Sequence, residues 1–183
     1  MALSKVDGTN FIDPTIPVAS GGTGAITLAA AGLANTPAFQ AYASADANGT
    51  YATWTKIAVN TELFDTDSDY DNSSNYRFTP TTAGKYYVYT NIRVGSTTGN
   101  VIDDAQVSIY KNGSAWKNAS IKSTSTGAEL DIASLTVTSI IDFNGSSDYV
   151  ETYYYVDTAA GQNQKFYGGQ TWSSFGAYRI IGV

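Results

Sequence analysis

Four aspartates recur at every second position of one short segment, at Asp65, Asp67, Asp69 and Asp71. Carboxylate oxygens are ligands that Ca²⁺ prefers, and a loop could turn all four toward one ion. In an extended strand, the same spacing would instead line one face with unpaired anions. The segment also lacks the glycine and the distal glutamate of an EF-hand loop. A Ca²⁺ site and a solvated acidic loop are therefore the alternatives, and we expect the solvated loop.

Paired carboxylates could also hydrolyse glycosides, which takes one acid together with one base or nucleophile. The only glutamates are Glu62, Glu129 and Glu151, and no spacing among them singles out such a pair. The chain has no histidine and no cysteine. A Ser-His-Asp triad, a cysteine nucleophile and zinc sites built on cysteine or histidine are therefore excluded. We expect a protein without enzymatic activity.

Aromatic side chains are the third group that could bind a ligand, and the chain has 14 Tyr, 7 Phe and 3 Trp. Trp172, Tyr167 and Trp116 could stack on sugars or on apolar patches of a receptor. The alternative is burial in the core or in a subunit interface, where aromatic residues of strands are usually found. Trp172 follows a glycine-rich turn and is the candidate we expect to be most exposed.

The charge balance argues against two classes of partner. There are 10 basic and 16 acidic residues, a net charge of -6, so no basic surface is expected for the phosphates of a nucleic acid. No stretch approaches the length of a membrane span, and the N-terminus lacks the apolar segment of a signal peptide. We expect no nucleic acid or membrane partner and no cofactor, with Ca²⁺ as the one alternative.

The elements that must position these groups are short strands. After residue 37, runs rich in aromatic and β-branched residues alternate with turn residues, a pattern typical of a sandwich or barrel. The predicted strands cover 38–43, 53–59, 76–79, 85–94, 106–111, 130–141, 149–156 and 175–181. Asn112-Gly113 predicts a type I′ hairpin, and Asn144-Gly145 a second one.

Residues 1–37 differ from the rest, because three prolines and the glycine-rich segment 20–24 prevent long regular elements. We predict an extended N-terminal arm with at most one short helix, over 25–33, followed by one domain over 38–183.

Two of the predicted strands carry large side chains at both parities, namely 86–89 and 153–156, each with three tyrosines and one valine. A half-exposed strand should alternate between apolar and polar residues. Both faces of these strands therefore need cover. The second face is expected to meet another subunit, with another part of this chain as the alternative.

The segment 76–88, with Phe78, Pro80, Gly84 and the aromatic run that follows, resembles the central segment of the C1q/TNF-like jelly roll. Residues 107–113, 145–150 and 174–180 resemble later segments of that family in the same order. This resemblance covers 38–183 and implies an all-β jelly-roll β-sandwich that forms homotrimers. The side chains then expected in the trimer interface are Tyr86, Val88, Tyr153, Tyr155, Phe175 and Tyr178.

The segment 16–25, together with Leu28 and Gly32, is similar to a segment that recurs in phage tail-fibre and related virion proteins. It implies a structural protein at the virion surface, on capsid or tail. Residues 1–37 would bind other virion proteins, and the trimeric knobs would adhere to a glycan or protein of the host surface. The alternatives are a capsid decoration or cement protein, a bacterial adhesive C1q-like module and, least favoured, a hydrolase.

Overall fold

The computed structural model describes residues 34–99, 102–123, 130–159 and 161–182. Within these ranges the chain forms strands and no helix, and so no helix that could cross a membrane. One compact unit spans Thr36–Val183. The predicted helix over 25–33 lies outside the described residues, as does the predicted arm up to residue 33.

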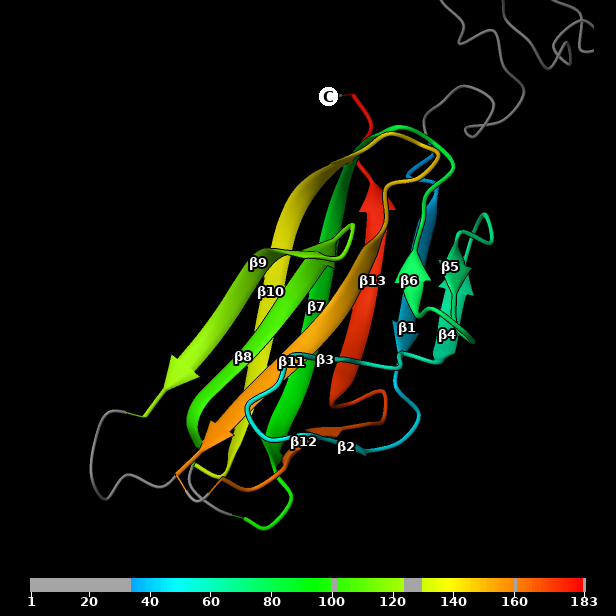
Figure 1. The fold of residues 1–183 in the computed structure, drawn as a ribbon. Coiled ribbons are helices and arrows are strands. Elements are labelled where there is room, and N and C mark those ends of the chain that lie inside the picture. The colour runs from blue at the N-terminus through cyan, green and yellow to red at the C-terminus, as the bar shows by residue number, and fades with distance from the viewer. Residues whose placement is uncertain (1–33, 100–101, 124–129, 160, 183) are drawn as a thin grey trace, which may run out of the picture. The chain divides into compact units, whose positions relative to one another are not determined.

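The strands form two antiparallel sheets that face each other as a sandwich (Figure 1). Sheet A has the order β2-β12-β7-β13-β1-β4, with β10 on the other edge of β7. Its strands are β1 (Ala38–Tyr42), β2 (Ala47–Gly49), β4 (Thr61–Asp65), β7 (Gly84–Ser96), β10 (Ile132–Phe143), β12 (Gln164–Tyr167) and β13 (Ser173–Arg179).

Sheet B has the order β5-β6-β11-β8-β9, and β3 pairs with the same β11. Its strands are β3 (Thr55–Lys56), β5 (Tyr70–Asp71), β6 (Arg77–Phe78), β8 (Ile102–Lys111), β9 (Ser114–Lys122) and β11 (Val150–Thr158).

Strand β7 organises sheet A because three strands pair with it. Strand β10 follows one edge along nearly its whole length, while β13 and β12 share the other edge one after the other. Near the start of β7, this register places Tyr87 between Ile140 and Tyr178. Near its end, Arg93 lies opposite Tyr167 of β12.

The core lies between the sheets and follows the alternation of β7. The even-numbered side chains of this strand point inward and are buried, from Tyr86 to Val94, whereas the odd-numbered ones point outward and are partly exposed. Thr90 and Thr152 share a hydrogen bond of 3.0 Å across the core, which satisfies two buried hydroxyls. Four rings, those of Phe39, Tyr70, Phe78 and Phe175, pack together at one end of the core.

The two predicted Asn-Gly hairpins have different outcomes. Asn112 and Gly113 have φ angles of 51° and 78°, and they join β8 to β9 as the predicted type I′ turn requires. The Asn144-Gly145 prediction is wrong, because this segment connects β10 of sheet A to β11 of sheet B and Asn144 is not among the residues with positive φ. Strands β2, β4, β5 and β12 were not predicted, and β9 was expected only as the second strand of the Asn112-Gly113 hairpin.

Candidate functional site

The four aspartates of the acidic segment, weighed as a Ca²⁺ site or a solvated loop, do not gather around one point. In the described part of the chain, no three acidic side chains come together to hold a metal ion. Asp69 is buried and accepts hydrogen bonds from the backbone and hydroxyl of Thr81, and burial raises the pKa of its carboxyl. The Asp65 carboxylate accepts a hydrogen bond from the backbone N–H of Tyr70. This hydrogen bond closes the turn between β4 and β5.

Asp71 and Asp67 are likewise used within the loop. The Asp71 carboxylate accepts hydrogen bonds from the backbone N–H groups of Ser73, Ser74 and Asn75, which hold its pKa far below the usual value. Asp67 accepts a hydrogen bond from the hydroxyl of Thr66. The carboxylates therefore bind local backbone and hydroxyl groups instead of converging on one point.

The candidate glutamates are separated by the fold. Glu62 lies on β4 of sheet A, and Glu151 lies on β11 of sheet B in an ion pair with Lys56. Burial raises the pKa of the Glu62 carboxyl. Glu129 lies outside the described residues.

Three of the side chains predicted in a trimer interface belong to the core instead. Tyr86, Val88 and Phe175 have no exposed surface, so they cannot contact another chain. The prediction selected even-numbered side chains of β7, and these point into the core. A clue lay further along the strand, where the even positions carry Ile92 and Val94 while the odd ones carry polar side chains.

Tyr153 and Tyr155 lie on the outer face of sheet B, where other rings of this chain cover them in part. Tyr153 stacks on Tyr110 with ring centroids 4.0 Å apart, and Trp54 lies 5.6 Å from Tyr155 and 5.9 Å from Tyr110. Trp54 precedes β3, which pairs with β11. The alternative expectation, cover by another part of the chain, is therefore met in part for β11, and both rings keep some exposed surface. A contact of Tyr153 and Tyr155 with another subunit stays a prediction.

Tyr178 differs from the other five predicted interface residues, because it lies on the outer face of sheet A. There it joins side chains that the sequence analysis did not select. The aromatic face, as we call it, consists of Phe64, Tyr87, Tyr89, Ile140 and Tyr178. Ile140 is 58% exposed, Phe64 and Tyr178 are also exposed, and the Tyr87 ring lies 5.4 Å from the Tyr178 ring.

The side chains of the aromatic face come from β4, β13, β7 and β10, with β1 between β4 and β13. Gly176 of β13 gives the Tyr89 ring room, since a Cβ at position 176 would lie 2.4 Å from the tyrosine oxygen. Gln40 of β1 lies next to Gly176 in the register and opposite Phe64 of β4. Within the described residues, no other strand packs over this side of sheet A.

Two of the three predicted ligand-binding aromatic residues come together around one arginine. The Arg93 guanidinium carbon lies 4.1 Å from the centre of the Trp172 ring and 5.1 Å from that of Tyr167. The backbone N–H of Arg93 donates to the carbonyl of Trp172, which attaches the loop after β12 to β7. We call Arg93, Tyr167 and Trp172 the arginine cluster. Sequence reasoning found the two rings and missed the arginine, because only the register of β7 and β12 brings them together.

Trp116 lies elsewhere, on β9 of sheet B. Its indole N–H donates to the hydroxyl of Ser139 on β10, so the ring bridges the open edge between the two sheets. The ammonium of Lys111 lies 5.6 Å from the ring centre. Trp116 is 50% exposed and Trp172 43%, so the expectation that Trp172 is the most exposed of the three candidates is wrong. Trp116 lies apart from the other two, on the other sheet.

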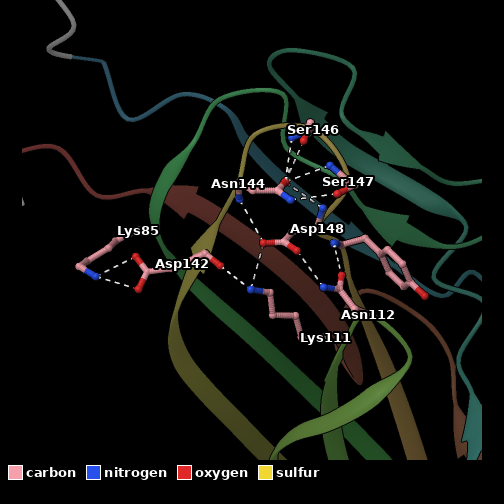
Figure 2. Close-up of polar contacts among 9 residues, drawn as sticks. Lys85, Lys111, Asn112, Asp142, Asn144, Ser146, Ser147 and Asp148 are labelled. Atoms are coloured by element: carbon pink, nitrogen blue, oxygen red, sulfur yellow. Dashed lines mark hydrogen bonds and ion pairs between the residues drawn. The ribbon is translucent and has the colours of Figure 1, made fainter.

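A polar network ties the turn between β8 and β9 to the loop between β10 and β11 (Figure 2). The side-chain oxygen of Asn144 accepts hydrogen bonds from the backbone N–H groups of residues 146–148. Asp148 accepts from Asn112 and from the backbone of Asn144, and it lies 3.1 Å from the ammonium of Lys111. These contacts hold the pKa of the Asp148 carboxyl below its usual value, with the Asn112 hydrogen bond as the largest cause.

No protein-family model matches the chain, and no curated protein matches its sequence. Among solved structures, the chain is similar to the structure of Eiger TNF from S. frugiperda. The TM-score is 0.58 and the sequence identity 12%, over 80% of this chain and 93% of that one. The predicted all-β, TNF-like jelly-roll sandwich is thereby confirmed.

Proposed function

We propose that this chain is a non-enzymatic structural protein of a phage particle. It forms homotrimers through the aromatic face, binds other virion proteins through residues 1–37 and displays its jelly rolls at the virion surface for adhesion to the host. The observation that carries this proposal is the aromatic face itself. Exposed patches of large apolar side chains are typical of interaction surfaces.

The composition of the outer face of sheet A supports a second copy of this chain as the partner. At one end of this face, Lys85 and Asp142 neutralise each other in an ion pair of 2.7 Å. The neighbouring outward positions carry uncharged side chains, including Thr138 opposite Tyr89. An apolar, nearly neutral face can meet its own copies without repulsion, and burial contributes roughly 25 cal/mol for each Å² of apolar area.

Two resemblances supply the rest of the proposal. The likeness of 76–88 and the later segments to the C1q/TNF-like family, whose members form trimers, supports three copies. The likeness of 16–25 to phage fibre segments supports the virion, with the arm as the attachment. Three linked knobs would raise the avidity for a repetitive host surface.

Mass measurement in solution tests the self-association. The full chain should have the mass of a trimer at micromolar concentration, and Ile140→Lys should convert it to a folded single chain by placing three charges in the interface. Ile121→Lys is the matched control, because Ile121 is 41% exposed on β9 of sheet B. A wild-type chain that stays single, or an Ile140→Lys variant that remains trimeric, would contradict the proposal.

A further inference from the structure

We infer that the arginine cluster binds a carboxylated sugar unit of an acidic surface polysaccharide. This inference rests on the proposed function, because it names the class of ligand that the displayed module would recognise. The observations that lead to it are a guanidinium without an acidic partner, two aromatic rings beside it and a loop that holds all three in place.

The guanidinium of Arg93 has unused capacity to bind an anion. Within the described residues it makes no ion pair and no side-chain hydrogen bond, and its Nε is buried without a partner. All four described ion pairs use lysine, among them the neighbouring Lys165, which lies 2.7 Å from Asp46. Acidic residues outnumber basic ones in this chain, 16 to 10. Among the described residues, Arg93 nevertheless lies beside two aromatic rings and not beside a carboxylate.

The rings supply the second half of the site. Trp172 is 43% exposed although the Arg93 guanidinium covers part of it, so a substantial area remains open to a ligand. The Tyr167 ring lies on the same side of sheet A as Arg93, and the ammonium of Lys165 is 4.5 Å from its centre. Because Asp46 neutralises Lys165, the platform consists of two adjacent rings beside one cation that is uncompensated among the described residues, the guanidinium of Arg93.

The loop that carries Trp172 is held rigidly. A Cβ at Gly168 would lie 2.2 Å from the backbone of Ala45, and Gly169 has a φ angle of 93°, which favours glycine. The backbone N–H of Gly169 donates to the carbonyl of Ala43. The backbone N–H of Ala43 in turn donates to the hydroxyl of Ser173. A site built in advance loses less conformational entropy when a ligand binds.

The chemistry of these groups selects the ligand. A guanidinium presents N–H donors in a planar fork that matches the two oxygens of a carboxylate. The C–H face of a sugar ring packs on an aromatic ring, with the polar groups at its edge. A uronic acid unit carries both features, because its carboxylate is attached directly to the sugar ring. Neutral sugars would leave Arg93 unpartnered, and a flexible acidic peptide would leave the rings uncovered.

The place of the cluster in the fold suits a surface receptor. Figure 1 shows β12 at the end of sheet A opposite the C-terminus, and the register agrees, because Tyr167 pairs with Arg93 whereas Arg179 pairs with Tyr86. Strand β1 begins at the same end as Arg179, since Ala38 pairs with Tyr178. A module attached through the chain that precedes β1 would present the arginine cluster at its far end.

Calorimetric titration of the full chain with an oligomer of galacturonic acid tests the site, and the methyl ester of the same oligomer is the uncharged control. Saturable binding is expected for the acid and not for the ester. Arg93→Gln should weaken it about tenfold by removing one charged contact, and Trp172→Ala about tenfold by removing the stacking surface. Arg93→Lys keeps the charge and loses the fork, so its affinity should also fall. Lys117→Gln, at an exposed position of β9, should bind like the wild type.

Any one of three results would overturn carboxylate binding at the arginine cluster. They are the absence of saturable binding to the acid oligomer, equal binding of acid and ester, and unchanged affinity in both the Arg93 and Trp172 variants. Equal binding of tetraglutamate would show that the site takes any carboxylate and would remove the assignment to a sugar. Thermal unfolding of each variant shows whether it is folded. Because titration needs neither trimer nor particle, its failure is distinguishable from failure of the proposed function.

Discussion

The Glu151 carboxylate is buried, and Lys56 is the counter-ion that compensates its charge. The Lys56 ammonium lies 3.1 Å from Glu151 Oε1 and also donates to the backbone carbonyl of Asn75. The second carboxylate oxygen accepts a hydrogen bond from the Tyr153 hydroxyl. Removing one partner of a buried ion pair leaves an uncompensated charge, whereas replacing both is often tolerated.

Lys56→Met should therefore lower the free energy of unfolding by about 3 kcal/mol, because Glu151 stays buried without its counter-ion. Adding Glu151→Gln should restore part of the loss. Lys85→Met is the matched control, since the exposed Lys85–Asp142 pair should contribute less than about 1 kcal/mol. Urea denaturation measures all three variants, and equal losses for the two lysine substitutions would contradict the assignment.

Tyr86, which is buried, and Tyr153, which is partly buried, predict the alkaline limit of the fold. Burial raises the pKa of Tyr86 and of Tyr153 to about 12, and the nearby Glu151 adds to the shift of Tyr153. In the unfolded chain a tyrosine titrates near pH 10. The contribution of these two groups is complete below about pH 10 and is lost as the pH rises toward 12.

Ultraviolet absorbance of tyrosinate should show one class of tyrosines that ionises near pH 10 and another that ionises only as the chain unfolds. Tyr153→Phe should remove one residue from the late class. Circular dichroism recorded in parallel identifies the unfolding step. A single transition for all tyrosines while the chain remains folded would count against the buried assignments.

At the scale of the elements, Asp148 connects the β8–β9 turn of sheet B to the loop that runs from β10 of sheet A to β11 of sheet B. It accepts hydrogen bonds from Asn112 in the turn between β8 and β9 and from the backbone of Asn144 after β10. Figure 2 shows this carboxylate between the two segments, with Lys111 beside it. The contacts depress its pKa, so they contribute to stability above about pH 4 and weaken as the pH falls through the depressed value.

Asp148→Ala should cost about 2 kcal/mol at neutral pH, because charged hydrogen bonds to two elements are lost. Its stability should also change less between pH 5 and pH 2 than that of the wild type. Thermal melting at both pH values measures the difference. Asp142→Ala is a control whose exposed carboxylate should matter little. Parallel acid sensitivity of wild type and Asp148→Ala would show that the network does not hold the loop.

At the scale of the whole molecule, the boundary of the compact unit guides a truncation. This unit begins at Thr36, and the carbonyl of Pro37 accepts a hydrogen bond from the backbone of Arg179. A chain that starts at Thr36 should fold, form trimers and fail to join virus particles, if residues before it supply the attachment. Solution mass and analysis of purified particles measure the two properties. A truncated chain that still enters particles would refute the anchoring role.

Much of the architecture was predictable because it depends on local patterns. Eight strand segments, the sandwich class and the Asn112-Gly113 turn follow from alternation, β-propensity and the need for positive φ at both turn positions. The short strands β2 and β12 were missed because they are defined mainly by pairing with distant partners. In the candidate site, Trp172 and Tyr167 were predictable as residue types, but their grouping was not.

The sequence by itself determined that the chain would form a β-sandwich rich in tyrosine, without histidine or cysteine chemistry. Only the tertiary structure decided which tyrosines face water. A run such as 86–89 has large side chains at both odd and even positions, so local alternation cannot identify the inward side. Tyr86 and Val88 point inward because β7 pairs with β10 and β13 and packs against sheet B. The same long-range pairing placed Trp54 beside Tyr155 and brought Arg93 to Trp172, contacts between residues far apart in sequence that no local pattern encodes.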